Sequence, residues 1–516
     1  MQRSHRAKAI AVLGTGSDVG KSVIVAGLCR LLRRAEIRVA PFKAQNMSLN
    51  SSVTPDGGEI GRAQALQAEA CGLLPHVDMN PILLKPESDR CSQVIVHGKV
   101  VATRDATAYF DGRRELFRAV QESYARLAGQ YDVMVIEGAG SAAEVNLRDR
   151  DLVNWPVVDF ADAQVVLVAD IDRGGVFAQV IGTLDLLAPE ERARIRGVII
   201  NRFRGDVSLF ADGVAFLEKR TGISVLGVLP FMRDLVLDQE DSLDDRLRRP
   251  VEFSDDQVNI AVVLLPHMSN FTDFNPLIHE RDVTLRYVSS PVQLIGADVV
   301  IIPGSKNTQA DLGYLRRKEF VSMLDAHVQG VGELVGICGG YQMLGRRIAD
   351  PFGIEGGGTG AGLGHLNVET QLLQHKLTTQ VDANPVEFPD ANPAMIRGYQ
   401  IHMGITYRVD ERPCFRIWSR TVRDIETLQK DIGHDNDLDG AVRQDGLVWG
   451  TYIHGLFDEP AFRRMWLNRV RDRKGLSPLA TEASETVTKQ LAGELDRWAD
   501  HLAKHVNVAP LLRSLQ

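Results

Sequence analysis

The chain has few cysteines for its 516 residues: Cys29, Cys71, Cys91, Cys338 and Cys414. Their number is odd, they are scattered along the sequence, and no two of them form a CxxC pair. This pattern excludes a disulfide framework and argues against a structural metal held by cysteines. We therefore expect a protein of the reducing cytoplasm.

Long hydrophobic runs and basic clusters are also missing. No apolar segment approaches the length of a membrane span, and no group of lysines and arginines is large enough to follow a phosphate backbone. The formal net charge of −8 also argues against a nucleic-acid surface. The start is basic, but a short apolar run leads from it straight into a glycine-rich loop, which is typical of a core strand and not of a signal peptide. The sequence thus predicts neither a membrane nor a nucleic acid as a partner.

The chain does have the length and the apolar content for more than one core. Hydrophobic residues make up 44% of it, and apolar runs of strand length alternate with helical patterns in both halves. Such alternation is typical of parallel sheets covered by helices. It is interrupted at 234–256 by a charged stretch that lacks a core stripe. We predict two doubly wound α/β domains at 1–240 and 257–516, joined by a linker at 241–256.

The second half carries two further local signals. A glycine-rich patch at 353–364 predicts a flexible loop. Beyond residue 482, the spacing of Leu491, Leu495 and Trp498 predicts a helix, which we expect to pack on the second domain.

The strongest signal in the first half is a glycine-rich loop between a strand and a helix. The apolar run 10–13 ends in the loop, and a helical pattern follows at 23–32. Amides of such a loop bind phosphates, Lys21 can reach the outer phosphates of ATP, and the hydroxyl of Ser22 can bind Mg²⁺. Lys21 has no evident reason to pack in the core. The ATP-binding residues predicted here are Gly14, Thr15, Gly16, Ser17, Asp18, Val19, Gly20, Lys21 and Ser22.

Two other strands of this half end in acidic residues. Glu137 ends one apolar run, and Asp170 ends another and is followed by Asp172 and Arg173. Ligands of doubly wound sheets bind at the carboxyl ends of the strands, so Glu137 is a candidate Mg²⁺ ligand. A solvated strand terminus is the alternative interpretation of each acidic residue.

The second half contains a cysteine at the end of an apolar run and before two glycines, a position typical of a catalytic nucleophile. The apolar run 334–337 ends at Cys338, and Gly339 and Gly340 follow. A strand that breaks into a sharp turn exposes the thiol, and the amides of the following helix can hold an oxyanion. A buried structural cysteine is the alternative, which the flanking glycines disfavour.

A candidate base for this thiol lies 116 residues further on, at His454, which follows an apolar strand and precedes a glycine. A packed core histidine is the alternative. Together, Cys338 and His454 resemble the site of the class I glutamine amidotransferases, in which a cysteine and a histidine release ammonia from glutamine. That resemblance implies oxyanion contacts from the backbone of Gly304 and Gly339. The family usually has a glutamate two residues after the histidine, whereas this chain has Leu456, so the third member of the site is left open.

The phosphate loop is one residue longer than the standard pattern, because Thr15 stands where the first glycine is usual. This longer loop resembles that of dethiobiotin synthetase and its relatives, which activate carboxylates with ATP. In those relatives the position of Asn201 reads the adenine base.

Taken together, the two halves resemble the cobyric acid synthases, which are ligases of cobalamin biosynthesis. The resemblance is carried by the Cys338 and His454 motifs and by the runs 43–51, 170–177 and 201–206. It implies a P-loop NTPase-like domain followed by a class I amidotransferase-like domain, with ATP and Mg²⁺ as cofactors and with glutamine and a corrinoid as substrates. The implied reaction is amidation of the b, d, e and g carboxylates of adenosylcobyrinic acid a,c-diamide to give adenosylcobyric acid.

Two alternative functions remain at this point. One is a P-loop switch ATPase whose second domain is a degenerate binding module. The loop has no lysine ahead of Gly20, which such switches usually carry, and this counts against it. The other is a cysteine hydrolase or peptidase regulated by ATP.

Overall fold

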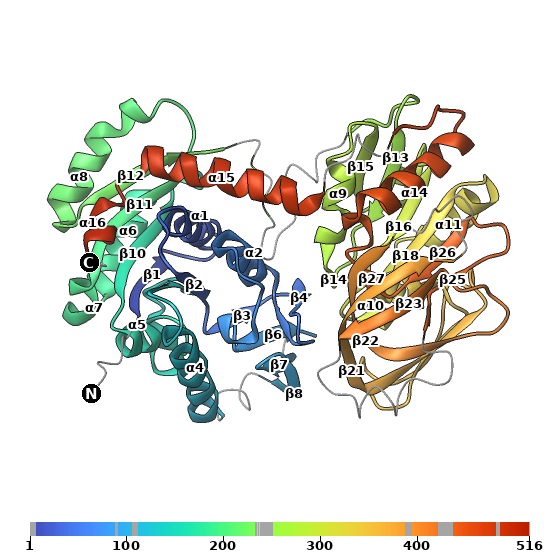
Figure 1. Ribbon diagram of the computed structural model, residues 1–516, viewed down its shortest axis with the longest axis horizontal. Coiled ribbons are helices and arrows are strands. Elements are labelled where there is room, and N and C mark those ends of the chain that lie inside the picture. The colour runs from blue at the N-terminus through green and yellow to red at the C-terminus, as the bar shows by residue number, and fades with distance from the viewer. Residues whose placement is uncertain are drawn as a thin grey trace.

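A computed structural model describes residues 7–87, 91–105, 112–232, 235, 237, 251–386, 395–421, 437–480 and 486–514. It divides into two α/β halves that lie side by side, with one long helix, α15 (Val487–His505), crossing between them (Figure 1). Most of the predicted linker lies outside the described residues, and the predicted domain limits stay a prediction.

The first half is built on a six-stranded parallel sheet in the order β12-β11-β10-β1-β9-β2. Helices cover both faces, so its strands are nearly continuous apolar runs. Successive residues of β1 serve opposite faces: Val12 packs toward α1, whereas Leu13 packs toward α4 and α5. The strands are β1 (Lys8–Gly14), β2 (Val39–Phe42), β9 (Val133–Glu137), β10 (Gln164–Asp170), β11 (Ile195–Phe203) and β12 (Val225–Pro230). The helices are α1 (Lys21–Arg34), α2 (Arg62–Cys71), α4 (Arg113–Ala128), α5 (Trp155–Ala161), α6 (Val176–Leu186), α7 (Pro189–Ala193) and α8 (Ala211–Thr221).

Between β2 and α4 the chain makes an excursion toward the second half (Figure 1). It forms a four-stranded sheet in the order β3-β6-β7-β8 and a separate β4-β5 pair. The strands are β3 (Gln45–Met47), β4 (Ser51–Val53), β5 (Glu59–Gly61), β6 (Ile82–Pro86), β7 (Cys91–Val96) and β8 (Lys99–Asp105). This excursion supplies the first half's side of the contact between the halves.

The second half also contains a six-stranded sheet, in the order β15-β13-β16-β18-β26-β25, in which only β25 is antiparallel to its neighbour. The predicted class of two doubly wound α/β units is therefore confirmed. The strands are β13 (Val258–Val263), β15 (Val283–Val288), β16 (Val299–Ile302), β18 (Glu333–Ile337), β25 (Ala441–Val442) and β26 (Val448–Thr451). The helices are α9 (Asn275–Ile278), α10 (Thr308–Arg317), α11 (Phe320–Gln329), α12 (Gly339–Leu344) and α14 (Pro460–Arg473).

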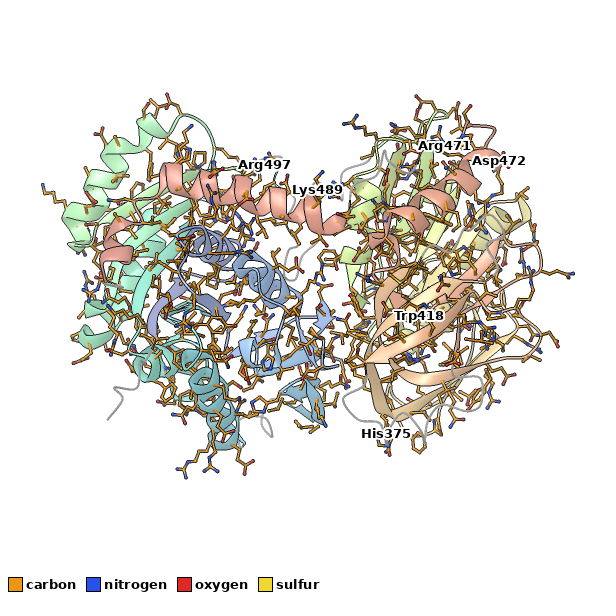
Figure 2. The ribbon with its side chains drawn as sticks, viewed as in Figure 1. His375, Trp418, Arg471, Asp472, Lys489 and Arg497 are labelled. Carbon is orange, nitrogen blue, oxygen red and sulfur yellow. The ribbon has the colours of Figure 1, made fainter. Side chains whose placement is uncertain are left out.

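A second, largely antiparallel sheet lies against this half, and its long β21–β22 pair lies toward the first half. Its strands are β19 (Arg347–Asp350), β20 (Gly358–Ala361), β21 (Val368–Pro385), β22 (Ile396–Arg408), β23 (Phe415–Thr421), β24 (Leu438–Asp439) and β27 (Ile453–His454). Part of the glycine-rich patch that we expected as a loop is strand β20, paired with β19. Side chains of the excursion and of this sheet fill the space between the halves, and Trp418 and His375 mark the sheet's position (Figure 2).

The expected packing of the C-terminal helix on the second domain is wrong. Helix α15, which carries Lys489 and Arg497 in Figure 2, packs against α1 of the first half. Trp498 donates its Nε1–H to the carbonyl of Val23 at 2.7 Å, and a Cβ on Gly27 would lie 2.7 Å from that Nε1.

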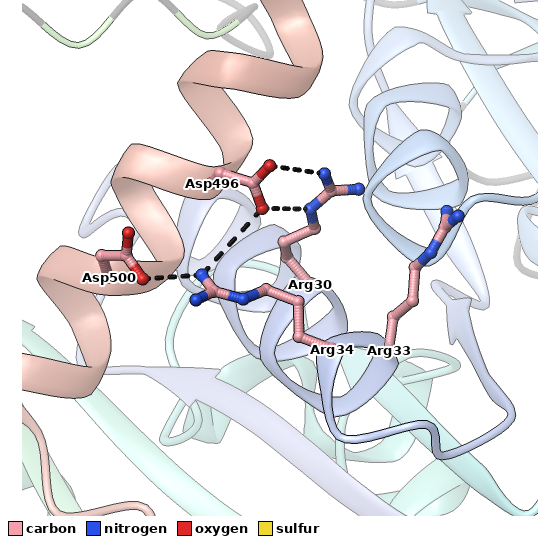
Figure 3. Close-up of a pocket in the computed structure, with 5 residues that line it drawn as sticks. All are labelled: Arg30, Arg33, Arg34, Asp496 and Asp500. Carbon is pink, nitrogen blue, oxygen red and sulfur yellow. Dashed lines mark hydrogen bonds and ion pairs between the residues drawn. The ribbon is translucent and has the colours of Figure 1, made fainter.

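Ion pairs line the edge of the same contact. Arg30 of α1 binds Asp496 of α15 with two hydrogen bonds of 2.8 Å, and Arg34 binds Asp500 at 2.6 Å (Figure 3). The periodicity of the tail identified the apolar stripe correctly, but an apolar stripe does not specify its partner. Among the described residues, no helix is both long and apolar enough to cross a membrane.

Candidate active sites

The phosphate loop joins β1 to α1 at the carboxyl edge of the first sheet. Gly20 has φ +93°, a left-handed conformation that favours glycine, and α1 begins at the next residue. The ammonium of Lys21 donates to the carbonyl oxygens of Gly16 at 2.9 Å and Gly140 at 3.0 Å. Lys21 is only 7% exposed, so our expectation that it has no packing role is wrong: it ties the loop to the segment after β9.

Glu137 ends β9 beside this loop and is fully buried, so the interpretation as a solvated strand terminus is wrong. One carboxylate oxygen accepts hydrogen bonds from Ser22 Oγ at 2.7 Å and Lys43 Nζ at 2.9 Å. The other accepts from Gln67 Nε2 at 2.5 Å and Gln64 Nε2 at 3.4 Å. A buried carboxylate held by so many donors has a fixed position next to the phosphate loop.

Ser22 and Glu137 fit a magnesium ion by the chemistry of their oxygens. Mg²⁺ prefers oxygen ligands and is usually held by one or two side chains together with phosphates and water. The described ranges contain no cluster of three or more His, Cys, Asp or Glu side chains suited to a metal. A hydroxyl and a carboxylate lie side by side at the phosphate loop. Two such side chains are enough for Mg²⁺, because phosphates and water supply its other ligands.

Asn201, near the carboxyl end of β11, lies against the phosphate loop. Its Nδ2 donates to the carbonyl of Val19 at 2.9 Å, and a Cβ on Gly20 would lie 2.2 Å from that nitrogen. Next to it, Arg202 bridges Asp18 of the loop at 3.1 Å and the buried Asp170 at 3.0 Å. These contacts fix the loop from the neighbouring strand ends.

Cys338 stands between β18 and α12 with φ 51° and ψ −108°. This is a strained conformation for a residue with a side chain, and it is typical of a nucleophile on a strand-to-helix turn. The turn is tight, because a Cβ on Gly340 would lie 1.9 Å from the carbonyl oxygen of Ile302. The thiol donates weakly to the carbonyl of Ile401 at 3.5 Å. Buried though it is, Cys338 lines a cavity, which disfavours a purely structural role.

His454 lies beside Cys338, and together with Asp273 these residues form the candidate glutaminase group. The Nδ1 atom of His454 is 2.6 Å from Oδ2 of Asp273. The other oxygen of Asp273 accepts from the backbone N–H of Gly455 at 3.1 Å. Burial by itself lowers the pKa of His454, but Asp273 and then Cys338 raise it to about 10. The carboxylate of Asp273 therefore favours the protonated form of the imidazole.

Asp273 is the residue that sequence reasoning missed. It lies in a short 3₁₀ turn at Phe271–Phe274 and is 5% exposed. Leu456, at the position where a glutamate is usual, is instead buried in the core. The one available signal was an acidic residue between two buried phenylalanines, because an ionised side chain in apolar surroundings requires a partner.

The glycines predicted to supply oxyanion contacts lie beside this group. Gly304 follows β16, and a Cβ on it would lie 3.4 Å from Cε1 of His454. A Cβ on Gly339 would lie 2.8 Å from the backbone nitrogen of Ser305. The carboxyl ends of β16, β18 and β26 thus bring the predicted residues of the second half into one place.

Comparison with known proteins assigns each half to a family. Residues 10–243 match the family described as the CobQ/CobB/MinD/ParA nucleotide binding domain. Residues 259–462 match the CobB/CobQ-like glutamine amidotransferase domain. A cobyric acid synthase from Syntrophobacter fumaroxidans is 46% identical, with 98% of each chain covered. Another from Klebsiella pneumoniae is 48% identical over 97% of this chain and 96% of its own. The chain belongs to the cobyric acid synthase family.

Membership of the cobyric acid synthase family decides between the functions considered above. The protein is an enzyme, a ligase of the glutamine amidotransferase type, with a nucleotide-binding domain. The alternatives of a switch ATPase with a degenerate module and of an ATP-regulated peptidase are wrong.

Proposed function

We propose that the protein uses glutamine and ATP to amidate the b, d, e and g carboxylates of adenosylcobyrinic acid a,c-diamide, giving adenosylcobyric acid. The observation that carries the proposal is the presence, in one chain, of a phosphate loop beside the buried Glu137 and of the group formed by Cys338, His454 and Asp273. The match with cobyric acid synthases along nearly the whole chain supports the choice of substrate.

The first half activates the carboxylate. A carboxylate resists attack by ammonia because oxide is a poor leaving group, so ATP transfers its γ-phosphoryl group to it and forms an acyl phosphate. Ammonia then attacks the acyl carbon, the carbon–oxygen bond to phosphate breaks, and an amide and inorganic phosphate are released. Lys21 neutralises charge on the transferring phosphoryl group, and Asn201 contacts the adenine.

Ser22 and Glu137 would hold the magnesium ion that accompanies ATP. When bound, the ion neutralises phosphate charge and orients the oxygens of the nucleotide. Lys43, Gln64 and Gln67 position Glu137, since each donates a hydrogen bond to its carboxylate. The hydroxyl of Ser22 donates a hydrogen bond to Oε1 of Glu137 at 2.7 Å.

The second half releases the ammonia. The sulfur of Cys338 attacks the side-chain amide carbon of glutamine and forms a thioester, while His454 gives a proton to the departing ammonia. Water then hydrolyses the thioester to glutamate. Backbone N–H groups of Gly304 and Gly339 hold the oxyanion, and Asp273 fixes the orientation of the imidazole. Free ammonia is almost entirely ammonium at neutral pH, so release in an enclosed site keeps it nucleophilic.

A direct test is to incubate the protein with ATP, Mg²⁺, glutamine and cobyrinic acid a,c-diamide in its adenosylated form, and to follow the corrinoid by mass spectrometry. Four successive mass decreases of one unit each, one for every carboxyl group converted to an amide, are expected. An unchanged corrinoid, with folded protein and all substrates present, would contradict the proposal.

The division of labour is tested with Cys338→Ser. We expect this variant to lose synthesis from glutamine and to retain synthesis from a high concentration of ammonium at alkaline pH, because the thiol serves only the ammonia source. A folded variant that ammonium does not rescue would show that the two sites are not separate.

A further inference from the structure

A cavity of about 50 Å³ lies between the two halves and is lined by Cys338. Its wall includes Lys85 from β6 of the first half, and Lys306, Lys376 and Glu355 from the second. Three cationic side chains and one carboxylate therefore surround a thiol in a site that neither half forms alone.

The cations at this cavity are only partly neutralised. Lys85 and Lys376 bind the same carboxylate, that of Glu59 in β5, at 2.8 Å and 2.5 Å. Glu59 is 1% exposed, and the side chains of Lys85 and Lys376 are 4% and 7% exposed. Two buried lysines share one carboxylate, so the cluster carries a net positive charge, with little access to water, whenever both lysines are protonated.

Lys306 forms its own ion pair with Glu87 at 2.6 Å and so adds no net charge, but its ammonium group still acts on Lys376. Burial lowers the pKa of Lys376 to about 7; Glu59 opposes this effect, whereas the charges of Lys85 and Lys306 add to it. An anion placed in the cavity would relieve this repulsion.

Glu355 gives the cavity a region of opposite charge. Burial raises its pKa, and its carboxylate accepts a hydrogen bond from the backbone N–H of Gln309 at 2.9 Å. It forms no ion pair with any other residue in the part of the chain that the structure describes. Hydrogen bonds from Gln309 and Thr308 and the charge of Lys306 partly offset this burial, and the ammonium group of a ligand would add to that compensation.

We propose that the cavity binds the α-amino-acid end of glutamine, with Lys85 and Lys376 on the α-carboxylate and Glu355 on the α-ammonium group. This inference rests on the proposed function, which places the side-chain amide of glutamine at Cys338. Its consequence is that the nucleotide-binding half supplies Lys85 to the glutamine site, so the site is complete only when the halves are docked.

The cavity is smaller than a glutamine molecule, so binding must widen it. The three lysines have long, flexible side chains, and a carboxylate ligand competes directly with Glu59 for two of them. Glutamine therefore rearranges contacts that join the halves, since Glu59 and Lys85 belong to one half and Lys376 to the other.

Two analogues of glutamine separate the two charged contacts. The first, 4-aminobutanamide, lacks the α-carboxylate, and the second, glutaramate, lacks the α-ammonium group. With ATP and corrinoid present, ammonia release is measured for each compound. Lys85→Met and Lys376→Met are expected to lower kcat/KM for glutamine about ten- to a hundred-fold and to leave 4-aminobutanamide almost unaffected. Glu355→Gln is expected to lower kcat/KM for glutamine similarly and to leave glutaramate almost unaffected.

A purely structural role for the lysines has a different signature. If they only neutralise Glu59, Lys85→Met lowers the rates with all three compounds equally, and the double variant Glu59→Gln/Lys85→Met restores them all. That result would overturn the inference. The double variant is instead expected to regain thermal stability without regaining the preference for glutamine over 4-aminobutanamide.

Ammonium-dependent synthesis and Cys338→Ser distinguish a failure of the proposed function from a failure of the cavity assignment. Each lysine variant should keep its synthesis from ammonium, which shows an intact first half. If Cys338→Ser still uses glutamine, the proposed function fails. If Cys338→Ser is inactive with glutamine but the lysine variants keep the wild-type preference among the three compounds, only the cavity assignment fails.

Discussion

Asp273 shows how one residue can fill a role that the local sequence leaves open. The carboxylate that binds His454 comes from a turn 181 residues away in the chain, at 2.6 Å from Nδ1. The usual position for an acid, Leu456, is buried among apolar side chains, where an ionised group would lack a partner. The imidazole is therefore oriented by Asp273, and the third member that the sequence left open needs no acid at position 456.

Replacing Asp273 by Asn should lower glutamine hydrolysis by about a factor of 10³ to 10⁴, because the amide favours the wrong tautomer of His454. Synthesis from ammonium should be unchanged. Steady-state rates with each nitrogen source check this, and equal losses with both sources would show that Asp273 acts on folding.

The same pair predicts a pH dependence of stability. The pKa of His454 is raised from 6.5 to about 10, so the folded state holds a proton that the unfolded state releases. Its contribution to the free energy of unfolding is full below pH 6.5 and declines as the pH rises toward 10. The difference in stability between the wild type and Asp273→Asn should therefore shrink from pH 6 to pH 10 in urea denaturation.

Lys21 has a structural role and, in the proposed function, a chemical role as well. Lys21→Met should abolish amidation with either nitrogen source, because phosphoryl transfer loses its cation. It should also lower the free energy of unfolding by about 1–3 kcal/mol, since two hydrogen bonds to loop carbonyls are lost. Amidation assays with ammonium check the first effect and urea denaturation without nucleotide checks the second. Retained synthesis would remove Lys21 from the site.

At the scale of elements, α15 ties the end of the chain to its beginning. Its apolar side packs on α1 next to the phosphate loop, with Trp498 5% exposed and Leu502 fully buried. Beyond the helix, Val506 forms an isolated bridge with Gly227 of β12. The C-terminal segment therefore belongs to the core of the first half, although α14 before it belongs to the second.

Trp498→Ala should destabilise the first half by about 3–5 kcal/mol, as expected for deletion of a buried aromatic side chain. Arg497→Ala on the same helix is the control, because its side chain is 47% exposed and, within the described ranges, pairs only with Glu494 one turn away. That change should be within about 0.5 kcal/mol of the wild type. Urea denaturation measures both, and equal stabilities of the two variants would contradict the packing of α15 on α1.

At the scale of the whole molecule, the halves are joined by polar contacts around the cavity. Asn270 accepts a hydrogen bond from the backbone N–H of Ser51 at 3.0 Å, and Gln380 donates to the carbonyl of Val53 at 2.6 Å. These contacts and the Glu59 cluster enclose the thiol between the halves. Release of ammonia into a closed space limits its escape to water.

Asn270→Gly should loosen this enclosure while the backbone keeps its conformation, because Asn270 has φ 53° and glycine adopts that region readily. The ratio of amide formed to glutamate formed should fall below the wild-type value. Synthesis from added ammonium should not change. Simultaneous quantification of glutamate and corrinoid amides checks this, and an unchanged ratio would show that the contact does not limit leakage.

The sequence by itself determined the α/β class and the two-part organisation, and it predicted residues for both sites. These features are local: apolar runs define strands, and glycines around Lys21 and Cys338 define turns whose geometry few other residues allow. Glu137 was visible for the same reason, as an acid at the end of a buried run.

Only the tertiary structure decided which distant residues and elements contact one another. Asp273 was hidden because its link to His454 is a contact across 181 residues, and α15 was misplaced because its apolar stripe fits any complementary surface. The cavity with Lys85 and Lys376 lies between two sheets from different halves. Which charged residues pair across such long separations in sequence depends on how the chain folds back on itself. A local pattern of residues therefore cannot predict these pairs.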